Sequence, residues 1–143
     1  MMKIYLSGWV GETLYRKHVL QNYSSLFDIR DPLTEVERKM NLDIEGYRSG
    51  RIDFPTTIIN DIVEGDISLL KSCDVLVAIM NRYSAGTIME IRIAYDADKP
   101  VYIIDPKRSM WRDIWLRYHA NIFFNSTTEC FNFLKTYVEI LYS

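Results

Sequence analysis

The sequence predicts a doubly wound α/β fold, in which a parallel sheet of five strands carries helices on both faces. Two observations support this prediction. Short apolar runs alternate with segments of helical periodicity along the chain. The segment 73–80 is almost entirely apolar, as is typical of a central parallel strand that is buried on both faces. With 143 residues the chain has the length of one domain, so we expect a single domain over 1–143.

The first half of the chain contains two predicted strands, one predicted helix and a long loop. The run 3–7 is apolar and ends at a glycine, and apolar residues recur at helical spacing over 12–23. A second short strand at 26–30 is stopped by an Asp-Pro pair. From 31 to 54 the pattern weakens, and we expect a long loop of the kind that often carries function in compact domains.

The second half of the chain repeats a helix-strand unit. Pro55 opens a helix at a position where its missing N–H costs nothing, and strand 73–80 follows. A turn then leads into a helix that runs from Gly86 to about residue 98. The remaining predicted elements are strand 101–104, helix 110–118, strand 121–124 and helix 127–141. This order is flavodoxin- or Rossmann-like, and such sheets bind ligands at the carboxyl ends of their strands.

The composition argues against several classes of protein. With 17 basic and 19 acidic residues the formal net charge is −2, which leaves no basic excess to neutralise the phosphates of a nucleic acid. The apolar runs are too short to span a membrane. The two cysteines, Cys73 and Cys130, predict no disulfide framework and no metal site, and they favour a cytoplasmic location. We assign His18 and His119 to structural roles.

The turn before the middle helix supplies the most informative carboxylate. Glu90 is expected in the first turn of a helix that follows a buried strand. A glutamate at that position is commonly a solvated residue that the helix dipole favours. The same dipole would also keep the carboxylate ionised in a partly apolar pocket, as a nucleophile requires. Spacing alone leaves both interpretations open.

A second acid, Asp66, is expected at the edge of the apolar face of the preceding helix. A solvated helix acid is the common outcome at such a position. Two carboxylates that meet in one pocket are also the arrangement that breaks glycosidic bonds. The end of the first strand, by contrast, has neither a dinucleotide fingerprint nor a Walker loop. Its two glycines, Gly8 and Gly11, are three residues apart and form no G-x-G-x-x-G.

An ordered set of segments connects these candidates. The segments are 4–8, then Asp66 followed eight residues later by 74–78, then 84–94 (Ser-Ala-Gly-Thr-Ile-Met-Glu-Ile-Arg-Ile-Ala), then 99–101. This set resembles the nucleoside 2-deoxyribosyltransferase superfamily, which includes hydrolases of nucleoside 5′-monophosphates. The likeness extends over nearly the whole chain and is weakest at 31–54 and after 104. It implies a nucleoside or nucleotide substrate and no metal or organic cofactor.

The resemblance also implies roles for individual residues. Glu90 would attack C1′ of the sugar, Asp66 would assist proton transfer beside it, and Tyr5 would orient the nucleophile. A glycosyl-enzyme ester would form, and water or a second base would resolve it. The candidate substrate-binding residues are Ser7, Gly8, Trp9, Tyr47, Ser84, Gly86, Thr87, Ser109 and Arg112. The last two would come from the neighbouring subunit of a homo-oligomer.

The signals divide between two activities of that superfamily. Ser84, six residues before Glu90, resembles the monophosphate hydrolases, in which this serine helps to bind phosphate. Gly8-Trp9, with no base before Arg16 in the following loop, resembles the transferases that exchange bases between deoxynucleosides. We favour cleavage of a nucleotide or nucleoside, with base exchange as the alternative. A hydrolase of NAD or of a cyclic nucleotide and a non-catalytic nucleotide-binding protein are further alternatives.

Overall fold

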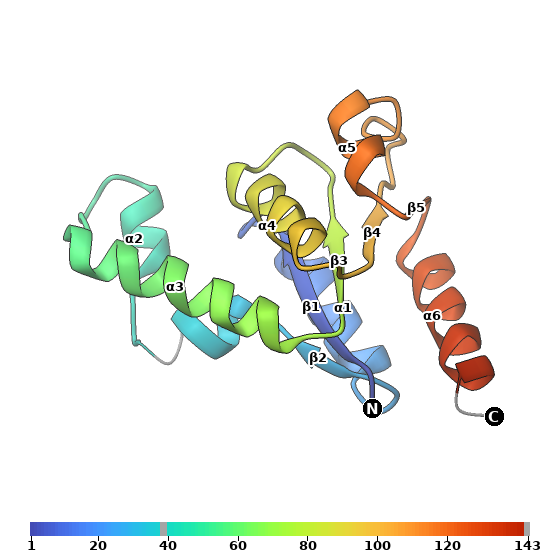
Figure 1. Ribbon diagram of the computed structural model, residues 1–143. Coiled ribbons are helices and arrows are strands. Elements are labelled where there is room, and N and C mark those ends of the chain that lie inside the picture. The colour runs from blue at the N-terminus through green and yellow to red at the C-terminus, as the bar shows by residue number, and fades with distance from the viewer. Residues whose placement is uncertain (38–39, 142–143) are drawn as a thin grey trace.

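The protein is built around one parallel sheet in the computed structural model, which describes residues 1–37 and 40–141 (Figure 1). The strands are β1 (Lys3–Gly8), β2 (Asp28–Arg30), β3 (Val75–Ile79), β4 (Val101–Ile104) and β5 (Ile122–Phe124). They lie in the order β2-β1-β3-β4-β5, and each neighbouring pair is parallel. Because the chain turns back from β2 and continues beyond β1 with β3, the order reverses at β1. The predicted doubly wound α/β fold is therefore confirmed.

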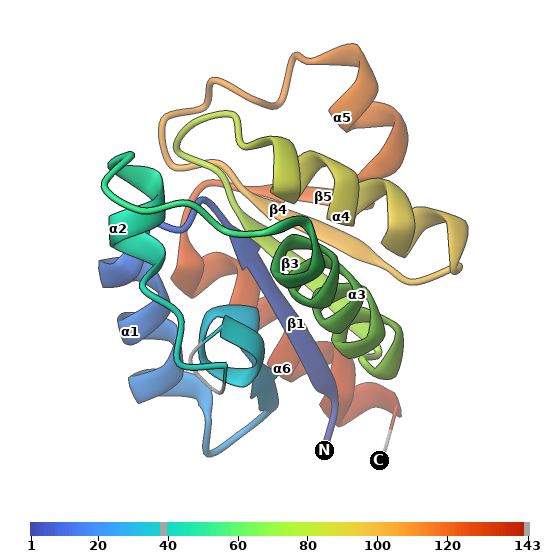
Figure 2. The same ribbon diagram turned by 90° about the vertical axis from the view of Figure 1, so that its left-hand side faces the viewer.

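Helices cover both faces of this sheet. They are α1 (Thr13–Tyr23), the π-helical turn η1 (Leu33–Glu37), α2 (Ile44–Arg48), α3 (Thr56–Ser72), α4 (Ala85–Asp96), α5 (Ile114–His119) and α6 (Thr127–Leu141). Helices α1 and α6 pack against one face, and α3, α4 and α5 pack against the other. Figure 1 shows α2 and α6 at opposite ends of the molecule, and Figure 2 shows α1 and α2 on one side of β1 with α3 on the other. Within the described ranges, none of the helices is long and apolar enough to cross a membrane.

Alternation along the strands divides the core into two apolar layers. In β1, Ile4 and Leu6 face one layer and Tyr5 faces the other, as the two-residue period of a strand requires. All positions of β3 are buried, as its apolar sequence predicts. Burial of each large aliphatic side chain contributes about 1.5–3 kcal/mol, so the two layers hold the strand ends firmly in place.

The segment 31–54 is not the open loop that its weak pattern predicts. It contains η1 and α2, which are five residues long each. Asp43 caps α2 by accepting a hydrogen bond from the Gly46 N–H at 2.9 Å. Elements this short contain no complete hydrophobic repeat, and periodicity therefore misses them. Residues 38 and 39 of the segment lie outside the described residues.

The segment after β4 also differs from its prediction. Helix α5 begins at Ile114, four residues later than the sequence predicts. The reason is Asp105, which is 2% exposed and accepts hydrogen bonds of 3.0 Å from the backbone N–H groups of Ser109, Met110 and Trp111. The Asp105 carboxylate holds residues 109–111 in a turn whose backbone is not helical, so α5 starts only after this turn.

Candidate active site

A cavity of about 310 Å³ opens beside the carboxyl end of β1 and the N-terminal half of α4. Its wall is formed by the loop after β1, η1, α3 and α4, and apolar side chains alternate there with a few polar ones. This is the composition of a small-molecule site, at the place where the fold class puts ligands. The predicted site residues that line it are Gly8, Asp66, Ser84, Gly86, Thr87 and Glu90.

Glu90 lines the cavity, and the buried side chains of Tyr5 and Ser7 contact its carboxylate from β1; these three residues are here called the β1 side. Tyr5 and Ser7 are two residues apart on β1, so both side chains point to the face that α4 covers. The Tyr5 hydroxyl donates a hydrogen bond to Glu90 Oε2, and the Ser7 hydroxyl donates one of 2.8 Å to Glu90 Oε1. Each oxygen of the Glu90 carboxylate therefore has a donor that a buried strand holds in place.

The environment of Glu90 differs from the sequence expectation in one respect. Helix α4 begins at Ala85, so Glu90 lies in the second turn, beyond the free N–H groups that were expected to keep it ionised. Burial raises the pKa of Glu90, and the hydrogen bonds from Tyr5 and Ser7 oppose that rise. The hydroxyls of Tyr5 and Ser7 therefore stabilise the ionised carboxylate of Glu90, an effect that the sequence led us to expect from the helix dipole. Burial and the charge of Glu90 raise the pKa of Tyr5, which keeps its phenol protonated as a donor.

Two further carboxyl groups line the cavity, Glu37 from η1 and Asp66 from α3, and they are here called the acidic side. Burial raises the pKa of Asp66 to about 8, and the charges of Glu37 and Glu90 add to the effect. Burial likewise raises the pKa of Glu37 to about 7. The acidic side therefore presents two carboxyl groups that hold protons near neutral pH, next to a third that has hydrogen-bond donors.

Several polar atoms of the cavity have no protein partner. Glu37 Oε2, Asp66 Oδ1 and Thr87 Oγ1 are buried and lack a hydrogen bond among the residues that the structure describes. Native proteins leave few such atoms, and all three belong to residues that line this one cavity. Within the same described ranges, no three His, Cys, Asp or Glu side chains are arranged to hold a metal ion.

A buried ion pair fixes the loop that closes this cavity. Arg16 of α1 is 5% exposed and pairs with Asp31 at 2.5 Å. Its guanidinium also donates a hydrogen bond of 2.6 Å to the Gly8 carbonyl at the end of β1. Gly8 approaches β3 closely, since a Cβ there would lie 3.0 Å from the Ile79 carbonyl oxygen. Arg16 thereby ties the ends of β1 and β2 together at the edge of the cavity.

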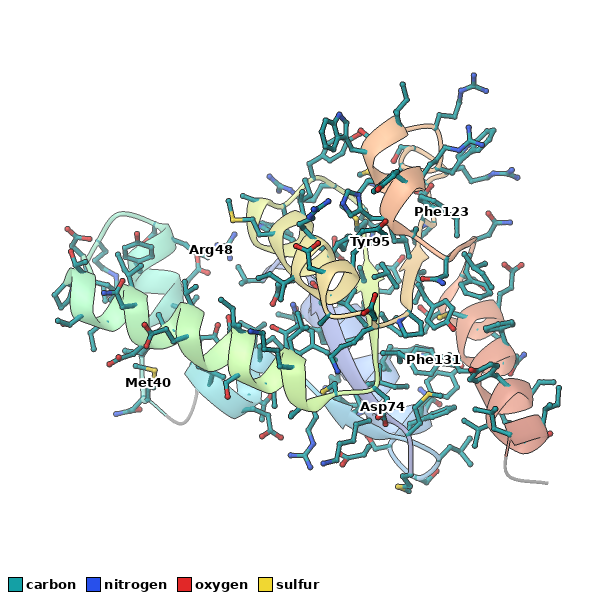
Figure 3. The ribbon with its side chains drawn as sticks, viewed as in Figure 1. Met40, Arg48, Asp74, Tyr95, Phe123 and Phe131 are labelled. Atoms are coloured by element: carbon teal, nitrogen blue, oxygen red, sulfur yellow. The ribbon has the colours of Figure 1, made fainter. Side chains whose placement is uncertain are left out.

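Two predicted aromatic residues do not line the cavity. Trp9 lies between the guanidinium groups of Arg48 and Arg82, whose central carbons are 4.8 and 4.1 Å from the ring centroid. Figure 3 shows Arg48 pointing from α2 toward α4. Tyr47 stacks on Phe54, with ring centroids 4.5 Å apart and planes 5° from parallel. Their suggested contact with a base stays a prediction.

The remaining candidates divide between the cavity and the surface. Ser84 immediately precedes α4 and lines the cavity, and its side chain makes no capping hydrogen bond to the helix. Ser109 and Arg112 are exposed in the turn after β4, outside the cavity wall of a single chain. The Arg112 guanidinium lies 5.2 Å from the centroid of the Trp111 ring.

Sequence reasoning did not identify Glu37 as a site residue. It lies in the weakly patterned segment, where no repeat indicated which side chains face inward. Arg16 was noted only as the nearest base to the first strand, although it lies three residues before the buried Val19 on the same helix face. That spacing is the one signal that could have placed Arg16 at the interior.

Comparison with known proteins places this architecture among solved folds. No protein-family model matches the chain, and no curated protein matches it. A 2-deoxyribosyltransferase from Bacillus psychrosaccharolyticus superposes with a TM-score of 0.64 at 19% identity, over 90% of this chain and 89% of that enzyme. A conserved protein from Enterococcus faecalis gives 0.63 at 16% identity, over 92% and 96% of the two chains. A CMP N-glycosidase from Clostridium botulinum gives 0.55 at 16% identity, over 94% and 98%. The chain therefore has the nucleoside 2-deoxyribosyltransferase-like fold.

Proposed function

We propose that this protein cleaves the N-glycosidic bond of a nucleoside 5′-monophosphate or a nucleoside, including deoxyribose forms, and releases the free base. The proposal rests on the position of Glu90. Its carboxylate oxygens are held by Tyr5 and Ser7, and it lines a cavity that also contains the proton-bearing Asp66. The fold neighbours, a 2-deoxyribosyltransferase and a CMP N-glycosidase, support the same class of chemistry.

In the first step the ionised Glu90 attacks C1′ of the sugar. A bond forms between a Glu90 oxygen and C1′ while the bond from C1′ to the base nitrogen breaks, and the electron pair leaves with the base. Asp66, whose pKa is raised to about 8, gives its proton to the departing base. Tyr5 and Ser7 hold the nucleophile in position during the attack.

In the second step water resolves the glycosyl ester on Glu90. The ionised Asp66 accepts a proton from the water, the water oxygen bonds to C1′, and the ester bond to Glu90 breaks. Glu90 returns to its ionised form and Asp66 to its protonated form. Two displacements at C1′ retain the configuration of the sugar. If a second base enters in place of water, the same steps give base exchange, which is the alternative activity.

The environment of the α4 N-terminus favours a nucleotide substrate. Ser84 and Gly86 line the cavity where the free N–H groups of the helix start, and such a site attracts a phosphate. Arg82, two residues before Ser84, adds a cation on the neighbouring loop, where it stacks on Trp9. A 5′-monophosphate would place its charge there, with the sugar between it and the acidic side.

The experiment that tests this function is the release of free base, measured by chromatography. Paired nucleosides and 5′-monophosphates are incubated with the protein, with and without a second free base. We expect release by the wild type, and a loss on the order of 10⁴-fold in Glu90→Ala, because the nucleophile is removed. The matched control is Asp96→Asn on the same helix, since Asp96 is exposed and pairs with Arg92.

Each outcome of that assay has a distinct meaning. Unchanged release by Glu90→Ala contradicts the mechanism. Release that occurs only with a second base identifies a transferase, and release from monophosphates alone identifies a nucleotide hydrolase. Tight binding without release by the wild type supports the non-catalytic binding protein.

We also propose that a second copy of the chain brings Ser109 and Arg112 to the cavity. The exposed apolar side chains of this region are Ile88, Met89, Trp111, Ile114, Trp115 and Tyr118. Met89 is 66% exposed and also lines the cavity, so a partner that covers this surface would reach the site. Light scattering should give a multiple of 16.9 kDa. Trp115→Glu should reduce both mass and activity, and a fully active monomer would contradict the proposal.

A further inference from the structure

Glu37 is a buried carboxyl group that the proposed reaction does not use. It is 7% exposed, ends η1, and lines the cavity together with Asp66 and Glu90. Its Oε2 atom is buried without a hydrogen-bond partner among the described residues. A buried acceptor without a partner costs about 1–3 kcal/mol, so the fold holds Glu37 at the cavity without a side-chain partner for this oxygen among the described residues. Glu37 is thus placed to contact whatever occupies the cavity.

The layout of the cavity places the base of the substrate beside Glu37. C1′ must lie next to Glu90, and a phosphate belongs near Ser84, where the N-terminus of α4 attracts an anion. The rest of the wall is apolar and suits the flat face of a base; it consists of Val10, Pro32, Leu33, Val63 and Ile67. Glu37 also lines the adjoining cavity of about 440 Å³, so its carboxyl group lies at the boundary of the two. The edge of a base held against this apolar wall therefore meets Glu37.

We propose that Glu37 selects bases that carry an exocyclic amino group, as cytosine and adenine do, over matched bases with an oxo group at the same position, as uracil and hypoxanthine do. This inference rests on the proposed function, because it takes a nucleoside or nucleotide as the occupant. Glu37 lines the cavity, and its ionised carboxylate only accepts hydrogen bonds, so an amino group of the base supplies a donor that the carboxylate can accept. An oxo group at the same position places a second acceptor against the carboxylate, and the two groups cannot pair.

The protonation state of Glu37 sets the strength of this selection. Burial is the main cause that raises the pKa of Glu37 to about 7. The charged and titratable groups that act on it from neighbouring elements are Arg16, Asp31, Asp66, Glu90 and Tyr5. Above that pH the ionised group accepts only. Below it the protonated group can donate to an oxo group, so the preference for amino-bearing bases should rise as pH rises through about 7.

The test is a competition within matched pairs, cytidine against uridine and adenosine against inosine, as nucleosides and as 5′-monophosphates. We expect the kcat/KM ratio of amino to oxo substrate to be at least about tenfold at about pH 8.5, and to fall to about threefold or less at about pH 5.5. Glu37→Gln should give a ratio near one at both values, because its amide does not titrate and can present either a donor or an acceptor. Asp66 titrates in the same range, and Glu37→Gln keeps Asp66, so any contribution of Asp66 to the pH dependence of the ratio is measured in this variant.

The matched control is Glu64→Gln. Glu64 is an exposed glutamate of α3 that lines neither this cavity nor the adjoining one. This variant should keep the wild-type ratio and its pH dependence. A ratio that stays unchanged in Glu37→Gln, or that changes equally in Glu64→Gln, overturns the role of Glu37.

A binding measurement separates this inference from the proposed function. In 1-methylcytosine and 1-methyluracil a methyl group replaces the sugar, so neither can be cleaved. Calorimetry should show tighter binding of 1-methylcytosine by the wild type at about pH 8.5, and no preference in Glu37→Gln. Equal binding of the two bases, or binding of neither, contradicts the selection. If no nucleoside or nucleotide is cleaved but the preference in binding persists, the reaction is wrong and the selection by Glu37 stands.

Discussion

The two sides of the cavity differ in how their carboxyl groups are partnered. On the β1 side, Tyr5 and Ser7 donate to the two oxygens of Glu90 before any ligand binds. On the acidic side, Asp66 and Glu37 each have a buried oxygen without a partner among the described residues. The difference indicates that the β1 side is organised by the fold itself, while the acidic side is completed by what it binds.

This difference also appears in the proton affinities of the carboxyl groups. Burial raises the pKa of Glu90, Asp66 and Glu37 alike. Hydrogen bonds from neutral hydroxyls oppose the rise only at Glu90. The hydroxyls thus oppose the effect of burial at Glu90, where a nucleophile is required, and burial is the largest cause of the raised pKa of Asp66, where a proton donor is required.

Among the changes that separate the two sides, the largest effect should come from removing the proton on the acidic side. Asp66→Asn keeps the shape of the side chain but cannot give a proton to the leaving base. We expect kcat for base release to fall by about 10²–10³-fold with little change in KM. The control is Asp61→Asn on the exposed face of the same helix. A rate in Asp66→Asn that matches the control would remove Asp66 from the chemistry.

A smaller effect should come from weakening the β1 side. Tyr5→Phe removes one of the two donors to Glu90, so the pKa of Glu90 should rise further. The ionised nucleophile then forms only at higher pH. The acidic limb of the plot of kcat/KM against pH should therefore move up by about one pH unit, and kcat/KM below neutrality should fall roughly tenfold.

The control for this change is Tyr102→Phe, a buried tyrosine on the opposite face of the sheet. It should leave the acidic limb in place. An unmoved limb in Tyr5→Phe would show that its hydroxyl does not set the ionisation of Glu90.

The smallest effect should appear in stability, and it again separates the two sides. The pKa of Asp66 is about 8 in the folded protein and about 3.9 in an unfolded chain, so the folded state binds more protons between these values. Stability therefore falls as pH rises through this window, and because Asp66 is only partly buried, solvent screening keeps the loss well below the limit of about 1.4 kcal/mol for each pKa unit. Melting temperatures of the wild type should fall between about pH 5 and 8, and those of Asp66→Asn should fall by several degrees less. Parallel curves would contradict the raised pKa.

The sequence predicts the β1 side better than the acidic side, for a physical reason. Tyr5 and Ser7 were candidates through the resemblance alone, but both lie on a strand that the apolar run 3–7 predicts, and the apolar run before Glu90 identifies the central strand. Both signals are local. The prediction that Glu90 lies in the first turn of its helix was wrong. Helix α4 begins at Ala85, and the sequence of a short loop does not show which residue is the first helical one.

The acidic side depends on contacts that no local pattern encodes. Glu37 becomes a cavity residue because a π-helical turn of five residues packs against α3, and Gly65 of α3 allows Val36 to come close. Arg16 is buried because Asp31, from a segment beyond β2, pairs with it. Such partners are known only when the chain has folded, so Asp66 was predicted from spacing and resemblance while Glu37 was not predicted at all.

The turn after β4 has a consequence for assembly. Asp105 holds three successive backbone amides, so residues 109–111 keep one conformation although they lie in a loop. An unrestrained backbone loses about 1–2 kcal/mol of entropy per residue when a partner orders it. Residues 109–111 lose this backbone entropy when the chain folds. Docking of this turn onto another copy of the chain would therefore cost little further entropy. The amides of Ser109, Met110 and Trp111 should accordingly exchange with solvent deuterium as slowly as those of a strand.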